Sequence, residues 1–355
     1  MDLRSVLVAT LAAQASAVWL AGVNIAGCDI GMDTSGNYQP EQAFNGQYGC
    51  PTNVGPSQMQ HFASKDQFNV FRIPVAWQSL VNNDLVTNKL DSSFMAKYDG
   101  LIQSCLNTGA YCIIDIHNYA RWWGQIVDQG GPQGSKLAET WAQLAAKYKG
   151  QDHVIFGIMN EPRTSGHPAD NSSPLPPQPT DDLDNAIWAS TLQKTVHAIR
   201  DAGATSQMIF LSATNYANAI SFPTDAQPLL DITNRDGTTT NLIFELHQYF
   251  DSQGGKNTYC DDALAGKFQD VADYLKSVGR QAFIGEMGSG NGQDCVDIVC
   301  PVLDVLNRNG DVYLGWTSWA AGNWWPSYEL NEVPNGGNDV GIVAQCFAPK
   351  FAASK

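Results

Sequence analysis

The chain has 355 residues, of which 43% are hydrophobic and only 15% are charged. The apolar and aromatic content excludes a disordered chain. Acidic residues outnumber basic ones by 35 to 20, so the formal net charge is −15. This balance argues against nucleic acid and anionic membranes as partners, because both attract basic proteins. The length suits two ordinary domains or one α/β barrel, and the composition is compatible with an uncharged polar partner such as carbohydrate.

The N-terminus has the pattern of a secretory signal. Arg4 precedes an apolar run over residues 6–13, and an A-x-A cleavage motif follows at 15–17. We therefore predict a signal peptide over residues 1–17 and a secreted, extracellular chain over 18–355. No later stretch is apolar over the roughly 18 residues that a membrane span needs, so no anchor is expected. The alternative for this segment is an ordinary N-terminal strand or helix.

Export predicts that the cysteines form disulfides. The chain has 8 Cys, and it has neither the C-x-x-C pairs nor the His-Cys clusters of a zinc site. Eight cysteines allow many connectivities, which sequence alone does not determine. Chain order suggests the pairs Cys28–Cys50, Cys105–Cys112, Cys260–Cys295 and Cys300–Cys346. A possible glycan acceptor, an N-x-S sequon, begins at Asn171.

Strand and helix signals alternate along the chain. Short apolar, β-branched runs predict strands over 19–27, 70–75, 111–117, 154–161, 208–213, 242–249, 282–288 and 313–320. Helical periodicity between them predicts helices over 94–106, 137–148, 187–199, 268–278 and 299–306. This alternation favours a parallel sheet, and eight strands fit a single closed (β/α)8 barrel. The competing open sheet would lead us to expect a G-x-G-x-x-G loop after the first strand, where the sequence is AGCDIGMDTSG. The Pro-rich segment 164–182 is predicted to be a long loop.

Polar and ionisable residues stand at or near the ends of these strands. The active site of such a barrel forms at the C-terminal ends of its strands, and the candidates there are Arg72, Asp115, His117, Asn160, Glu161, His247, Tyr249, Glu286 and Trp319. Glu161 and Glu286 could form the carboxylate pair that glycoside hydrolysis needs, one protonated to assist the leaving oxygen and one ionised. A spacing of about 5–5.5 Å would give retention, and about 6.5–9.5 Å inversion.

Other interpretations of these residues remain. A lone Glu at a strand end is more often a salt-bridge partner than a catalyst, and a lone His is more often structural. A metal site is the rival enzymatic hypothesis, with His117, Glu161, His247 and Glu286 as ligands. The chain has no H-x-H or H-E-x-x-H spacing, and Arg72 would oppose a cation, so we predict neither metal nor cofactor. A Ser-His-Asp mechanism lacks its G-x-S-x-G elbow.

Tryptophans near the predicted strand ends indicate the substrate class. Sugar rings have apolar C–H faces that stack on indole, although a single Trp is more often part of a core. Trp122 and Trp123, like Trp324 and Trp325, are adjacent pairs in loops flanked by glycine. Burying both members of such a pair is difficult, which favours a carbohydrate platform.

The motifs together resemble glycoside hydrolase family 5, and most closely its fungal secreted endo-β-1,4-glucanases. They include GVNIAG at 22–27, QMQHF at 58–62, FRIPVAWQ at 71–78, DIHNYARW at 115–122, GIMNEP at 157–162 and TTNLIFELHQYFDS at 239–252. The resemblance implies a retaining mechanism on β-1,4-glucan and cello-oligosaccharides without a cofactor. We also expect the chain to be a monomer. It departs from the family pattern at Arg163, at Trp123 and in the Pro-rich loop, and no separate cellulose-binding module is expected.

The resemblance also implies roles for individual residues. Glu161 would be the acid/base and Glu286 the nucleophile, held ionised by Arg72 and Tyr249. The substrate would contact Asn160 at the 2-hydroxyl, His117 and His247 along the reacting subsite, and Trp319 beneath it. Trp122 and Trp123 are expected as platforms from their position in the glycine-flanked loop, not from the resemblance. The alternatives are a mannanase or xyloglucanase of the same family, and a barrel that binds glycan without cleaving it.

Overall fold

The computed structural model describes residues 17–40, 49–163, 183–323 and 328–355. Eight parallel strands close a barrel in the order β1-β10-β9-β8-β7-β6-β3-β2, which confirms the predicted (β/α)8 architecture. These strands are β1 (Leu20–Ala26), β2 (Val70–Val75), β3 (Tyr111–Ile116), β6 (Val154–Gly157), β7 (Ile209–Ser212), β8 (Leu242–Tyr249), β9 (Ala282–Gly288) and β10 (Tyr313–Gly322). A small antiparallel pair, β4 (Arg121–Trp122) and β5 (Gln125–Ile126), follows β3.

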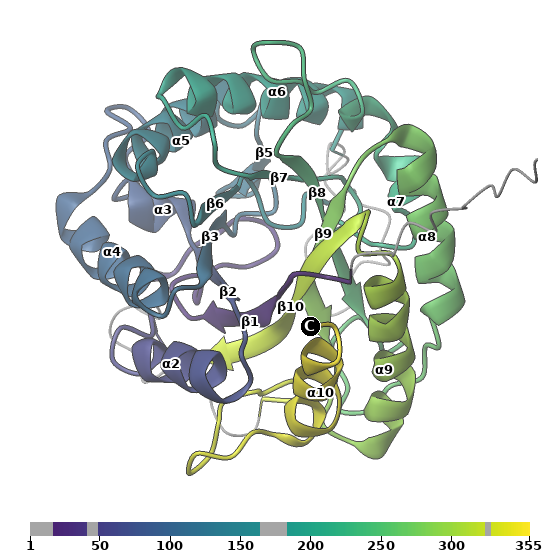
Figure 1. Cartoon of the computed structure of the whole chain (residues 1–355). Helices are drawn as coiled ribbons and strands as arrows, with labels where there is room; N and C mark the ends of the chain where they lie inside the picture. Colours follow the sequence, from purple (N-terminus) through teal and green to yellow (C-terminus); the bar gives the residue numbers. More distant parts are fainter. Residues whose placement is uncertain (1–16, 41–48, 164–182, 324–327) are drawn as a thin grey trace, which may run out of the picture.

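Helices surround the barrel (Figure 1). They are α2 (Gly55–Lys65), α3 (Trp77–Leu80), α4 (Ser92–Asn107), α5 (Gly134–Tyr148), α6 (Asn185–Asp201), α7 (Phe222–Asp225), α8 (Ala265–Val278), α9 (Gln293–Arg308) and α10 (Ala348–Ala352), with a 3-10 turn at Gln227–Leu229 and a π turn at Val343–Phe347. The five predicted helices correspond to α4, α5, α6, α8 and α9. Within the described residues, no helix is long and apolar enough to cross a membrane.

The barrel interior begins with an apolar layer to which each strand contributes one buried residue. The layer comprises Leu20, Val70, Ile113, Ile155, Phe210, Ile243, Phe283 and Leu314. Side chains on a strand alternate between its two faces, so the residue two positions further on points the same way. Three of those next residues are charged and fully buried: Arg72, Asp115 and Glu245. Going from the N-terminal toward the C-terminal ends of the strands, the barrel interior therefore changes from an apolar layer to a charged layer.

Four disulfides join the cysteines in the pairs suggested by chain order, Cys28–Cys50, Cys105–Cys112, Cys260–Cys295 and Cys300–Cys346. The predicted strand boundaries agree within two residues except at β6, which ends at Gly157 rather than at Glu161. The chain leaves the strand conformation there, and Glu161 has a φ of +41°. The predicted signal segment up to Ser16, the Pro-rich loop with Asn171, and the pair Trp324–Trp325 lie outside the described residues.

Candidate active site

Arg72 on β2 is the centre of the charged layer. Its side chain is fully buried, and a guanidinium has five N–H donors that all require acceptors. Four hydrogen-bond acceptors surround it: Glu245 Oε1 for Nε at 2.9 Å, Asn24 Oδ1 and Glu286 Oε1 for Nη1 at 3.0 and 2.8 Å, and Asn160 Oδ1 for Nη2 at 2.8 Å. Nη2 also forms an ion pair with Asp115 Oδ1 at 3.0 Å. One side chain thus links β1, β3, β8, β9 and the segment after β6.

Glu286 on β9 is held from both sides. Its Oε1 accepts from Arg72, and its Oε2 accepts from the Tyr249 hydroxyl at 2.7 Å. Burial alone would raise the pKa of this carboxyl, but the positive charges of His247 and Arg72 and the Tyr249 hydrogen bond outweigh it and lower the pKa. Glu286 is therefore the carboxylate that stays ionised.

Glu161 has the opposite electrostatic environment. Burial and the nearby negative charge of Glu286 raise its pKa above the ordinary value, against the opposing effect of His247. His247 Nδ1 lies 2.9 Å from Glu161 Oε1 and 3.6 Å from Glu286 Oε2. Burial would lower the pKa of His247, but the surrounding carboxylates raise it to about 10. Two neighbouring carboxyls with pKa values moved in opposite directions are a typical acid and base arrangement.

His117, just after β3, lines the same site. Its Nδ1 is 2.8 Å from Asp115 Oδ2, and its ring stacks on Trp319 with centroids 5.5 Å apart and an interplanar angle of 15°. The indole nitrogen of Trp319 donates to the Tyr328 hydroxyl at 2.7 Å. Asp115 therefore fixes the imidazole, and Trp319 lies beside it as a rigid apolar surface.

The adjacent tryptophans after β3 have different environments. Trp122 is 9% exposed and packs edge-on against Trp77, with centroids 5.0 Å apart. Trp123 is 43% exposed, and its indole nitrogen donates to Asn83 Oδ1 at 2.8 Å. Trp123 also lines a surface pocket with Tyr38 and Asn83, so it is the member of the pair with a face available for stacking.

Sequence reasoning missed Glu245, which lies fully buried on β8. It accepts from Arg72 Nε at 2.9 Å and from Ser212 Oγ at 3.0 Å. Burial would raise its pKa, but the positive charges of Arg72 and His247 lower it to about 2. The sequence could have indicated Glu245 as a site residue, because Glu245, His247 and Tyr249 alternate along one strand and therefore share a face.

Two side-chain groups in the described part of the chain could hold a metal ion. One is Glu161, His247 and Glu286, whose potential ligand atoms all lie within 4.8 Å of one another. This group is a subset of the metal ligands considered from sequence, and Arg72 lies beside it. The other is His61, Asp66 and Asp339, which belongs to α2 and to the segment after β10.

A parallel barrel that brings two carboxylates together at the carboxyl ends of its strands is an architecture of glycoside hydrolases. The family model described as Cellulase (glycosyl hydrolase family 5) matches residues 30–322. The chain belongs to glycosyl hydrolase family 5, as its motifs predicted.

Curated relatives and solved structures agree with this assignment. The chain is 45% identical over 349 residues to Endoglucanase EG-II of Hypocrea jecorina, covering 94% of this chain and 78% of that protein. It is 37% identical over 340 residues to the Manganese dependent endoglucanase Eg5A of Phanerodontia chrysosporium, covering 94% and 80%. The crystal structure of Cel5A (EG2) from Hypocrea jecorina superposes with a TM-score of 0.83 at 43% identity, covering 94% of this chain and 99% of that one. XacCel5A in complex with cellopentaose gives 0.79 at 28% identity, covering 94% and 99%.

Proposed function

We propose that this chain is a retaining endo-β-1,4-glucanase that hydrolyses internal bonds of cellulose and related β-glucans. The observation that carries the mechanism is the carboxylate pair. A carboxylate oxygen of Glu161 and one of Glu286 lie within 4.8 Å of each other. An inverting enzyme needs about 6.5–9.5 Å between its carboxyl groups to admit a water, whereas a retaining enzyme needs only about 5–5.5 Å. The spacing therefore supports retention.

The two steps follow from the protonation states. The Glu286 carboxylate attacks the anomeric carbon while the Glu161 carboxyl gives its proton to the departing glycosidic oxygen, so that a glycosyl ester forms and the sugar–oxygen bond breaks. Glu161, now ionised, takes a proton from water, whose oxygen attacks the anomeric carbon and releases Glu286. The proton from water restores the acid, and the two inversions retain configuration.

Asn160 is placed to recognise the reacting sugar. Its Oδ1 is occupied by Arg72, which fixes the amide orientation, while its buried Nδ2 has no hydrogen-bond partner among the described residues. A buried donor without an acceptor is costly, by about 1–3 kcal/mol. A sugar hydroxyl would satisfy it. We assign this donor to the 2-hydroxyl, whose hydrogen bonds strengthen in the transition state.

The relatives support the glucan as substrate. EG-II is named an endoglucanase, and XacCel5A has been crystallised with cellopentaose. A mannanase or xyloglucanase of the same family is the alternative. Initial rates on carboxymethyl cellulose, mannan and xyloglucan distinguish them, and our proposal requires the highest rate on the β-1,4-glucan.

The decisive variant is Glu286→Gln. It keeps the shape of the side chain but removes the nucleophile, so kcat on cellopentaose should fall by several orders of magnitude while the protein remains folded. Glu139→Gln, at an exposed position, is the matched control and should retain full activity. Near-normal turnover in Glu286→Gln would overturn the assignment, as would an α-anomer as the first product observed by NMR.

The same pair predicts a bell-shaped pH dependence of kcat/KM with an acidic optimum. The lowered pKa of Glu286 sets the acid limb, because the rate falls when this carboxylate is protonated. The raised pKa of Glu161 sets the alkaline limb, because the rate falls when this acid loses its proton. A flat profile from about pH 4 to 8 would contradict this assignment of roles.

The chemistry above uses no metal, although the Phanerodontia relative is named manganese dependent. Full activity after treatment with EDTA is therefore expected, and loss of activity restored by Mn²⁺ would overturn a metal-free mechanism. We also propose that the chain is secreted and monomeric. Four disulfides support export, and light scattering of the purified protein tests the monomer.

A further inference from the structure

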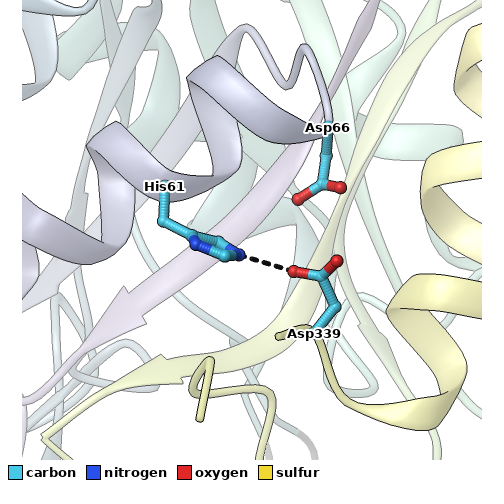
Figure 2. A group of neighbouring side chains, drawn as sticks. All are labelled: His61, Asp66 and Asp339. Atoms are coloured by element: carbon cyan, nitrogen blue, oxygen red, sulfur yellow. Dashed lines mark hydrogen bonds and ion pairs between the residues drawn. The ribbon is translucent and has the colours of Figure 1, made fainter. Parts of the chain in front are cut away.

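We propose that His61, Asp66 and Asp339 form a binding site for a divalent transition cation that joins α2 to the segment after β10. His61 lies in the last turns of α2, and Asp66 follows the helix directly as its C-cap residue. Asp339 comes from the loop after β10, 278 residues away from His61 in the sequence. Figure 2 shows the three side chains converging from these two segments.

The potential ligand atoms are already close together. One atom from each residue lies within 4.8 Å of the others, and His61 Nε2 is 2.6 Å from Asp339 Oδ1. Ligands about 2.1 Å from one ion lie at least about 3 Å apart, so an ion would replace this hydrogen bond and separate the two atoms by a few tenths of an ångström. His61 is partly exposed, with 16% of its side chain accessible, so water can complete the coordination.

Asp66 provides the independent observation that points to a ligand. It is 93% buried, with only 7% of its surface exposed, and its Oδ2 has no hydrogen-bond partner in the described residues. The Asp66 carboxylate faces the Asp339 carboxylate (Figure 2). A buried carboxylate oxygen beside a second carboxylate, with no donor of its own, is electrostatically unfavourable. A bound cation would satisfy both carboxylates together.

Lys65 is the competing positive charge. Its Nζ lies 2.8 Å from Asp339 Oδ2 and 3.1 Å from the carbonyl oxygen of Gly337. It therefore occupies the second oxygen of Asp339 and leaves Oδ1 for the ion. Its side chain is 42% exposed, so it can also turn outward when an ion binds.

The ligand set selects the kind of cation. One imidazole nitrogen and two carboxylates suit Zn²⁺ and Mn²⁺, and Zn²⁺ binds such sets more tightly than Mn²⁺. Ca²⁺ prefers six to eight oxygen ligands and does not favour an imidazole nitrogen. The site belongs to the helical shell and makes no contact with the Arg72 network, so its role would be to fasten the segment after β10 to α2.

The competing explanation is that Asp66 simply carries a proton. Burial and the negative charge of Asp339 raise its pKa to about 6, so a proton could relieve part of the repulsion at low pH. This explanation requires no ion, and it predicts that added metal has no effect at neutral pH. The two explanations therefore differ in a measurable way.

The test uses the full-length protein, freed of metal with EDTA and dialysed at pH 7. Isothermal titration with ZnCl2 should give one ion bound per chain, and MnCl2 should bind more weakly. At a hundredfold excess over Kd, Zn²⁺ should raise Tm by about 4 °C. CaCl2 should produce neither effect.

Asp66→Asn is the diagnostic variant, since it keeps the shape and removes the charge. It should fold, with an apo Tm no lower than that of the parent, and it should lose at least about tenfold in Zn²⁺ affinity, as expected when a metal ligand is removed. Asp231→Asn, at an exposed position, is the matched control and should bind Zn²⁺ like the parent. No Zn²⁺ binding by the parent would overturn the proposal. Unchanged binding in Asp66→Asn would also overturn it, because the ion would then lie elsewhere, for example at Glu161 and Glu286.

Discussion

Tyr249→Phe tests the electrostatic account of the nucleophile most directly. The variant removes one atom, the hydroxyl that donates to Glu286 Oε2 at 2.7 Å, and leaves the ring in place. A hydrogen bond to a charged group contributes about 1.5–3 kcal/mol. Each pKa unit corresponds to about 1.4 kcal/mol. The pKa of Glu286 should therefore rise by about 1–2 units when this bond is lost.

The assay is the pH dependence of kcat/KM on cellopentaose, which reports the pKa values of the free enzyme. Because Glu286 must be ionised, the acid limb of the variant should move to higher pH by about 1–2 units. The alkaline limb should stay in place, since Glu161 receives its hydrogen bond from His247 and still faces an ionised Glu286 at that pH.

Tyr148→Phe is the matched control for this experiment. The Tyr148 hydroxyl also donates to a carboxylate, Asp99 Oδ1 at 2.8 Å, but it belongs to α5 in the helical shell. Removing that hydroxyl should leave both limbs unchanged. An acid limb that does not move in Tyr249→Phe would refute the claim that this bond keeps Glu286 ionised, and equal shifts in both variants would refute its local origin.

Two further variants test the surroundings of the reacting pair. Glu245→Gln should lower the free energy of unfolding by about 1.5–3 kcal/mol, because Arg72 keeps an acceptor but loses a buried charge. The pKa of folded Glu245, about 2, is below its ordinary value. The stabilisation by this carboxylate is therefore present above about pH 4.5 and is lost as pH falls toward 2. Denaturant unfolding should show a smaller difference in stability between the parent and Glu245→Gln at pH 2.5 than at pH 6. Trp123→Ala should remove one stacking contact of about 0.5–1.5 kcal/mol and so reduce kcat/KM on cellopentaose about 2–13-fold, with a smaller loss on cellotriose. An equal loss on both substrates would contradict a distal platform.

The fold was predictable because the barrel strands have an unusually clear pattern. Strands that are buried on both faces form continuous apolar runs, and each run here ends near a polar residue. The direction of the strands then places Glu161 and Glu286 at the same end of the barrel, although 125 positions separate their numbers in the sequence. The family motifs strengthened this prediction.

The parts of the site that sequence did not predict depend on contacts between distant strands. Glu245 stands two positions before His247, but its importance comes from Arg72, 173 residues away. The adjacent residues Trp122 and Trp123 have equal chemistry, and only packing against Trp77 determines which one is covered. Periodicity describes the face of a strand, and it contains no information on which partner fills that face.

The charged layer also explains why some substitutions would be more informative than others. Arg72 carries the positive charge that faces three buried carboxylates, Asp115, Glu245 and Glu286. Removing one partner of a buried ion pair typically costs about 3–5 kcal/mol, because the other charge is left uncompensated. Loss of activity in an Arg72 variant would therefore combine damaged folding with damaged chemistry. Tyr249 contacts Glu286 through a neutral hydroxyl at the edge of this layer, so its removal changes the pKa of Glu286 while the ion pairs that hold the barrel together remain.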